Sequence, residues 1–204
     1  MSCTATPIPT AATVSTSEEK RSIRRSRSCR SRGRSRTSAT WPRRNGTWVN
    51  NAGIFGAKPF LETTVEDLER FFTTNVRGTF LMTQAIVPLM LEDGGSIINV
   101  GTALVEKAMT TLPVSAAMAS KGGVHALTVS LAAELAKYGI RVNTLAPGII
   151  RTPLIDDPDS LAAIHPLGHV GEVRDTSDAA LFLATAAFVT GATLDVDGGY
   201  SHGR

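Results

Sequence analysis

The sequence lacks the features that mark several classes of protein. It has only two cysteines in 204 residues, Cys3 and Cys29, and both lie near the N-terminus. No disulfide framework can therefore hold the rest of the chain, which is typical of a reducing compartment. No apolar run approaches the roughly 18 residues of a membrane span, and the N-terminus has no apolar core of a secretory signal. We expect a soluble, cytoplasmic protein that makes no membrane contact.

Basic residues are scarce outside the N-terminal segment. Residues 1–45 carry eleven of the 21 Lys and Arg but only two of the 18 Asp and Glu, for a net charge of +9, so residues 46–204 carry −6. The basic character of the whole chain therefore comes from this segment. A mildly acidic body is not typical of a nucleic-acid-binding domain, and we expect no nucleic-acid partner for it.

Residues 1–45 also lack any periodicity that could bury an apolar face, and they contain the run RRSRSCRSRGRSR at 24–36. We predict a disordered Ser/Arg-rich tail. Three interpretations remain open for it: an organellar transit peptide without a visible amphipathic helix, an RNA-binding tail, or a segment without function that arose from a shifted frame or a misplaced start. The abrupt change of character at residue 46 favours the third.

From Thr47 onward, short apolar strands alternate with helices. The pattern predicts strands at 47–51, 94–101, 140–146 and 193–199 and helices at 63–90, 116–138 and 176–187. Lys137 and Gly139 are the residues expected where the second helix stops. Strands separated by helices of ten or more residues predict a parallel sheet with crossover helices.

Five motifs follow one another along these elements, namely NNAG at 50–53, N-V-x-G at 75–78, GSIINV at 95–100, ASKGGVHALTVSLAAELAKYGIRVNTLAPGIIRTP at 119–153 and VTGATLDVDGG at 189–199. In this order they resemble the short-chain dehydrogenase/reductase family. The resemblance covers residues 47–204 and implies an α/β fold with a Rossmann-like, doubly wound parallel sheet. We therefore divide the chain into the tail, 1–45, and a partial Rossmann-fold domain, 46–204.

Ligands of such sheets bind beyond the carboxyl ends of the strands, where NNAG and APG both lie. Glycine at 53 and 148 lets the backbone approach a ligand closely. The resemblance implies that NAD or NADP binds here, with its adenosine side bordered by NNAG, its ribose held by the lysine and its carboxamide held by the loop after APG. The cofactor-binding residues implied are Asn51, Ala52, Gly53, Lys121, Pro147, Gly148, Ile150 and Thr152.

The family transfers hydride between the cofactor and a small alcohol or carbonyl substrate, assisted by Asn, Ser, Tyr and Lys. The resemblance gives Asn75, Thr102 in place of the serine, and Lys121 as catalytic residues, with Ser115 as a second hydroxyl candidate. The tyrosine is the general acid/base, and the lysine cation lowers its pKa. Its position holds Ala117, which has no exchangeable proton. Whether the chain is an active enzyme is therefore open.

A second departure lies ahead of NNAG. The sequence has no T-G-x-x-x-G-x-G loop, which in the family sets backbone amides against the pyrophosphate, so the predicted fold lacks the first βα units. The alternative function is a catalytically inactive family remnant that keeps only an oligomerisation surface, formed by helices at 64–91 and 116–138. That surface predicts a homodimer or tetramer.

Three histidines and an acidic loop remain. His165 and His169 lie in a Pro- and Gly-containing loop, and DVDGG ends before the glutamate that a calcium loop needs. We expect no metal site. His125 is expected on the surface of its helix.

Overall fold

The strands form one parallel sheet whose order is that of the sequence. The computed structural model describes residues 46–153 and 155–203. The strands are β1 (Thr47–Asn50), β2 (Gly95–Val100), β3 (Ile140–Pro147) and β4 (Thr193–Val196). Each pairs with the next in parallel, with Asn50 opposite Asn99 and Asn99 opposite Thr144. The predicted parallel sheet is confirmed, and β2 is buried almost throughout.

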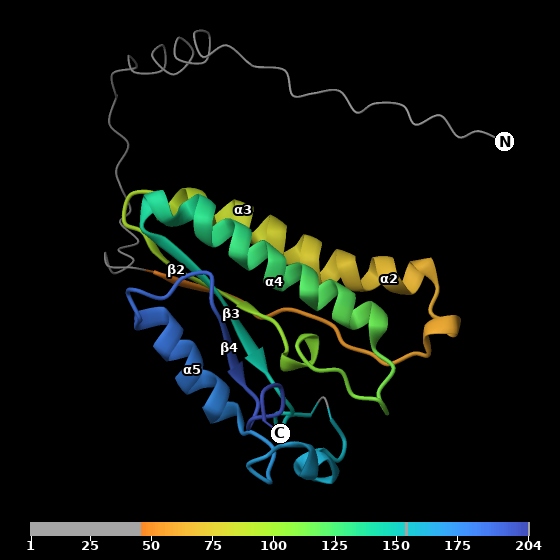
Figure 1. Ribbon diagram of the computed structural model, residues 1–204. Helices are drawn as coiled ribbons and strands as arrows, with labels where there is room; N and C mark the ends of the chain where they lie inside the picture. The colour runs from red at the N-terminus through yellow and green to blue at the C-terminus, as the bar shows by residue number, and fades with distance from the viewer. Residues whose placement is uncertain (1–45, 154, 204) are drawn as a thin grey trace, which may run out of the picture. The chain divides into compact units, whose positions relative to one another are not determined.

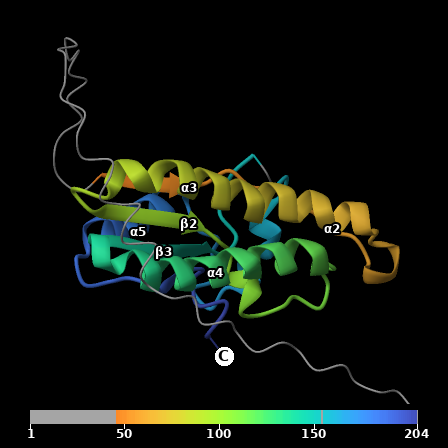
Figure 2. The ribbon, with the colours of Figure 1, turned by 90° about the horizontal axis from the view of Figure 1, so that it is seen from above.

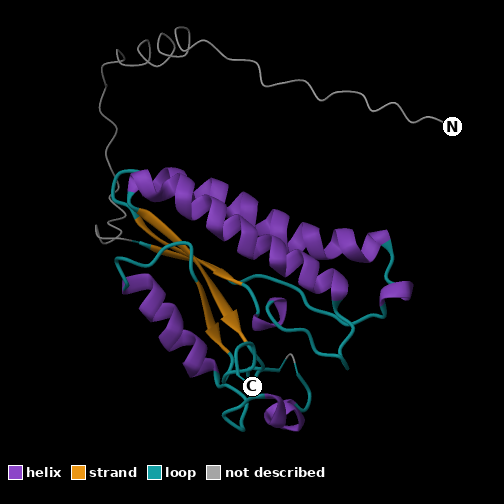
Figure 3. Cartoon of the chain, viewed as in Figure 1, coloured by secondary structure: helices purple, strands orange, loops and turns teal. Residues whose placement is uncertain are grey.

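Helices cover both faces of this sheet, as Figures 1 and 2 show. One face carries α3 (Gly78–Met90) and α4 (Ser115–Leu135), and the other carries α5 (Val173–Thr185), while α2 (Val65–Phe71) continues the line of α3 beyond the strands. The same two layers appear when helices and strands are coloured separately in Figure 3. A parallel sheet with both faces covered is the Rossmann-like arrangement that the alternating pattern predicts.

Successive residues of the strands face opposite layers. Ile97 and Val142 are fully buried in the cluster beneath α3 and α4. Their neighbour Ile98 and, further along β3, Leu145 belong to the cluster that packs against α5 through Leu183. Both faces of these strands are therefore buried, as in other parallel sheets, and several of their buried residues are polar, among them Ser96, Asn99 and Asn143.

The helix predicted over 63–90 is interrupted. A π-helical segment, Phe72–Arg77, lies between α2 and α3 and contains Asn75. Thr64 caps the start of α2 in a reciprocal pair with Asp67, as a capping box requires. Extra-residue turns of this kind are frequent at functional sites, and this one contains the buried Asn75.

The other helices lie close to their predicted ranges. α4 continues through a 3₁₀ turn, Ala136–Tyr138, and stops at Gly139, which has a φ of 68°; glycine adopts this left-handed conformation without strain. α5 begins three residues earlier than predicted, and a 3₁₀ helix at Pro158–Ile164 was not predicted. No helix of the described residues has the length and apolarity to cross a bilayer. The predicted tail, 1–45, lies outside the described residues.

Candidate active site at the carboxyl ends of the strands

The carboxyl ends of the strands bring together residues from four segments of the chain. The Lys121 ammonium, on α4, donates a hydrogen bond of 2.8 Å to the carbonyl of Val100 at the end of β2. A Cβ atom on Gly53 would lie 3.1 Å from Lys121 Nζ and 3.2 Å from Asn75 Oδ1. Glycine at 53 therefore leaves room for both side chains, and this triangle of Gly53, Asn75 and Lys121 is the centre of the candidate site.

Asn75 clamps the loop that follows β1. Its Oδ1 accepts a hydrogen bond from the Ile54 amide at 2.8 Å, and its Nδ2 donates to the Ile54 carbonyl at 3.0 Å and to Ser120 Oγ at 2.9 Å. The side chain is 1% exposed. Thr79 Oγ donates to the backbone carbonyl of Asn75 at 2.8 Å. All the hydrogen-bonding atoms of the amide are thus engaged in holding the 51–54 loop to α4.

Lys121 is a half-buried cation. Burial lowers the pKa of Lys121 from its ordinary value, because the protein interior disfavours the ammonium form. The carbonyl of Val100 accepts one of its three protons, which leaves two donors for a ligand hydroxyl. A lowered pKa and free donors suit the role of binding a ribose or moving a proton.

The two hydroxyl candidates lie in different surroundings. Thr102 Oγ donates to the Pro147 carbonyl at 3.3 Å and accepts from the Leu104 amide at 3.3 Å, so it ties the end of β2 to the end of β3. Ser115 is exposed at the start of α4. Of the two, Thr102 lies at the same strand end as Val100, whose carbonyl binds Lys121. Thr102 is therefore the better placed of the two to act together with Lys121.

Ala117 is 1% exposed and lies in an apolar cluster with Phe71, Val114 and Ala116. Its carbonyl accepts a hydrogen bond from Ser120 Oγ at 2.7 Å. The position that would hold the tyrosine thus carries a methyl group in an apolar environment, and it contributes no acid or base.

The loop after β3 is held by protein contacts. A Cβ atom on Gly148 would lie 2.8 Å from the Cα atom of Asp197. Glycine is needed at this position because the ends of β3 and β4 meet there, whether or not a ligand also approaches the backbone. Ile150 pairs with Gly171 in an isolated bridge, and Thr152 accepts from the Ile155 amide at 3.2 Å.

Arg151, which lies between Ile150 and Thr152 in the sequence, binds Asp159 through two hydrogen bonds of 2.8 and 2.6 Å and Glu172 through one of 2.9 Å.

The structure thus joins some of the predicted site residues and not others. Gly53 lies beside both Asn75 Oδ1 and Lys121 Nζ, and a hydrogen bond joins Thr102 to the Pro147 carbonyl. Asn51 and Ala52 are exposed on the loop that Asn75 clamps. Within the described part of the chain, neither Ile150 nor Thr152 forms a hydrogen bond with Lys121, and both remain predicted cofactor contacts.

Two histidines lie closer to this region than the sequence indicated. The expectation that His125 is a surface residue is only partly met: the residue is half-buried, and its Nε2 atom is buried, finds no hydrogen-bond partner among the described residues and occupies the space over Gly101. Burial lowers the pKa of His125, against the attraction of Glu106 and with the repulsion of Lys121. His165 is 3% exposed and accepts from the Ile149 amide through Nε2 at 3.4 Å, so it supports the loop after β3.

Ser120, which accepts from Asn75, was also missed. No rule of spacing marks it, because its partner lies 45 positions away. The absent side chain at Gly101 was the one signal in the sequence that could have indicated His125.

Comparisons with known proteins agree with this arrangement. The family model described as enoyl-(acyl carrier protein) reductase matches residues 33–201. The chain is 40% identical over 164 residues to a cyclopentanol dehydrogenase of Comamonas sp. (strain NCIMB 9872), covering 75% of this chain and 64% of that protein. The chain thus spans less than two thirds of the length of this curated relative.

Solved structures give the same result. A blue fluorescent protein from a metagenomic library, solved in complex with NADPH, is 41% identical with a TM-score of 0.71, over 76% of this chain and 64% of that one. A short chain dehydrogenase/reductase family protein is 38% identical with a TM-score of 0.70, over 76% and 67% of the two chains.

Proposed function

Since this chain belongs to the short-chain dehydrogenase/reductase family, we propose that it is an NAD(P)-dependent oxidoreductase acting on a small alcohol or carbonyl compound, with impaired turnover. The observation that carries this proposal is the convergence of Gly53, Asn75 and Lys121 at the carboxyl ends of the strands, where ligands of such sheets bind.

The residues present fit the nicotinamide side of the cofactor. Lys121 has two unused ammonium protons beside the exposed 51–53 loop, and they suit the hydroxyls of a ribose. Pro147, Gly148, Ile150 and Thr152 would border the carboxamide. When bound, the cofactor supplies or accepts the hydride. The sequence offers no glycine-rich phosphate loop, so we expect weak binding.

The chain's own residues have three tasks in this scheme. Asn75 holds the 51–54 loop in place, Lys121 orients the ribose, and Thr102 faces the substrate oxygen from the end of β2. None of them replaces the tyrosine directly. General acid/base assistance contributes about 10²–10⁴-fold, so we expect turnover to fall by a factor of that order while Ala117 is present.

A fluorescence titration with NADH and NADPH tests the cofactor part. We expect a dissociation constant well above the low-micromolar range and a further loss of binding in Lys121→Met, with Lys137→Met, on the exposed end of the same helix, as the control. A low-micromolar constant contradicts weak binding. Complete absence of binding, in the wild type as in Lys121→Met, supports the alternative of an inactive remnant.

The catalytic part is tested by Ala117→Tyr with a panel of ketones, followed through NAD(P)H absorbance. We expect the rate to rise at least about tenfold, since a well-placed general acid contributes more than this. If Ala117→Tyr folds like the wild type and its rate is the same, another group, Thr102 or Ser115, already carries the proton.

Self-association and location complete the proposal. α3 and α4 present an apolar groove lined by Phe80, Val87, Pro88 and Leu131, and Leu89 is exposed beside it. We assign this face to a two-fold contact with a second copy, in a homodimer or tetramer. The confinement of cysteine to positions 3 and 29 favours the cytoplasm.

A further inference from the structure

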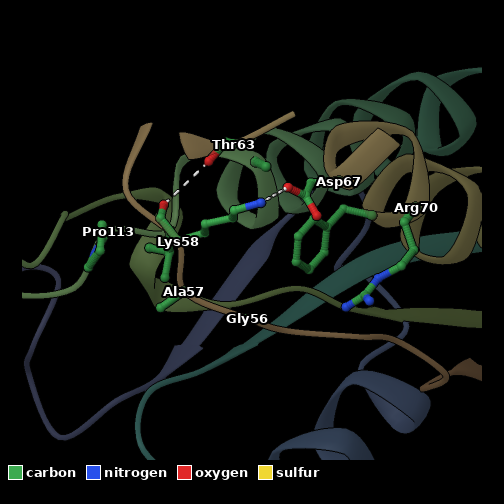
Figure 4. Close-up of a pocket in the computed structure, with 10 residues that line it drawn as sticks. Gly56, Ala57, Lys58, Thr63, Asp67, Arg70 and Pro113 are labelled. Carbon is green, nitrogen blue, oxygen red and sulfur yellow. Dashed lines mark hydrogen bonds and ion pairs between the residues drawn. The ribbon is translucent and has the colours of Figure 1, made fainter. Parts of the chain in front are cut away.

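A second cavity lies away from Lys121, between the loop after β1, α2 and the start of α4. It has a volume of about 110 Å³ and is lined by ten residues, among them Gly56, Lys58, Asp67, Arg70, Val114 and Ala116. Figure 4 shows Lys58 reaching across to Asp67 while Arg70 extends away from this pair. The cavity therefore combines an apolar floor with a charged rim.

The charges on the rim do not cancel. Lys58 Nζ and Asp67 Oδ2 are 2.5 Å apart and neutralise each other, and Lys58 is the main cause of the lowered pKa of Asp67. Arg70 stacks over Phe71, with 5.6 Å from Cζ to the ring centroid. Among the described residues, no carboxylate lies within 4.0 Å of its guanidinium. One positive charge is thus left over, and the positive end of the α4 dipole lies on the same wall.

The floor limits the size and nature of the occupant. Phe71, Val114 and Ala116 are buried apolar residues, so they suit a short hydrocarbon. The volume is smaller than the about 150 Å³ of a cavity that binds benzene. From the floor and the rim together, we infer that this cavity binds the carboxylate end of a small aliphatic acid, with Arg70 as the partner of the carboxylate.

A monocarboxylate fits this site better than a phosphate. The planar fork of arginine matches a carboxylate through two parallel hydrogen bonds. A dianion would meet only one uncompensated cation, because the charge of Lys58 is already neutralised by Asp67. The inference is independent of the proposed redox chemistry, because it concerns binding alone.

Thermal unfolding in sodium propionate, against sodium chloride of equal ionic strength, tests the site. A ligand that binds the folded state raises the unfolding temperature in proportion to ln(1 + [L]/Kd). We expect stabilisation by propionate, none by neutral propionamide, and less by inorganic phosphate. In Arg70→Gln the dissociation constant for propionate should rise at least about tenfold, since hydrogen bonds to charged groups are worth this much or more.

Two variants serve as controls. Arg70 is exposed on α2, so its replacement should leave the fold intact, and Arg70→Lys should bind with intermediate strength. Arg174→Gln removes another exposed arginine, which among the described residues is paired with Asp178 on α5, and this variant should respond to propionate as the wild type does. The inference fails if propionate gives no shift, if Arg70→Gln responds like the wild type, or if propionamide or phosphate stabilises as strongly as propionate.

Discussion

The clamp formed by Asn75 makes a quantitative prediction about the loop beside the candidate site. Asn75→Ala removes three hydrogen bonds, two to Ile54 and one to Ser120, from a side chain that is 1% exposed. A typical intramolecular hydrogen bond contributes about 0.5–1.5 kcal/mol net, and a stranded buried partner costs more. We expect the free energy of unfolding to fall by about 2–4 kcal/mol.

Urea unfolding followed by circular dichroism measures this loss, and the slope of the transition shows whether the unfolded state has changed. Ser120→Ala removes one partner of Asn75 and the hydrogen bond to the Ala117 carbonyl, so its cost should be smaller, about 1 kcal/mol. The double variant should cost less than the sum of the two, because the Asn75–Ser120 bond is counted in both.

Hydrogen exchange separates a local clamp from a general loss of stability. In Asn75→Ala the Ile54 amide loses its acceptor, so its exchange should accelerate more than that of Val142, at the centre of β3. Ser177→Ala, which removes one exposed bond within α5, should change stability by less than about 0.5 kcal/mol. A loss below about 1 kcal/mol for Asn75→Ala, or equal acceleration at both amides, would refute the clamp.

Three further predictions concern the rest of the fold. Gly101→Ala places a Cβ atom against His125 Nε2 and 2.7 Å from Thr144 Cγ2, so urea unfolding should show a loss of stability of about 1–3 kcal/mol. Adding His125→Ala should recover only part of this loss, because the contact with Thr144 remains; simple additivity of the two variants would contradict the contact with His125. His125 faces Glu106 and Lys121, and its pKa is lowered in the folded protein, so the unfolded state binds a proton at His125 at a higher pH than the folded state does. The free energy of unfolding should therefore fall as the pH drops below about 6.5. His125→Gln should remove this part of the loss, and identical pH profiles of the variant and the wild type would contradict the prediction. Two surfaces should cause self-association: the apolar face of α3 and α4, and the β1 edge, where Val49 is 43% exposed. Size-exclusion chromatography with light scattering should therefore show dimers and soluble aggregates. A monodisperse monomer of about 22 kDa would exclude both contacts.

The sequence was sufficient for the sheet, because its segments are short, bounded by glycine and rich in β-branched residues, as in SIINV after Gly94 and Gly95, and because helical segments separate them. It was also sufficient for the end of α4, since glycine at 139 adopts a conformation that other residues avoid. The interruption at 72–77 could not be predicted in this way. Its residues keep the same apolar spacing as a continuous helix, and the hydrogen-bond partners of Asn75 within it, Ile54 and Ser120, lie 21 and 45 positions away in the sequence.

The histidines show the same limit for the site. The sequence predicts His125 on the surface of its helix, but its Nε2 atom is buried. Its actual place depends on Gly101, 24 residues earlier, which leaves the space that the imidazole fills. His165 depends likewise on the Ile149 amide. Local patterns specify which face a residue occupies, but pairs that are distant in sequence are fixed by strand register and helix packing.

The surroundings of Ala117 bear on how a restored tyrosine should be interpreted. Ile54, Leu112 and Met118 pack against the cluster that contains Ala117 and Phe71, so a phenol ring at 117 has to displace side chains that are already in contact. Overpacking of this kind typically costs about 1–3 kcal/mol. Ala117→Phe adds the same ring without the hydroxyl and should incur the same cost. A rate gain in Ala117→Tyr that Ala117→Phe does not share therefore belongs to the proton of the hydroxyl, because packing and stability are matched between the two variants.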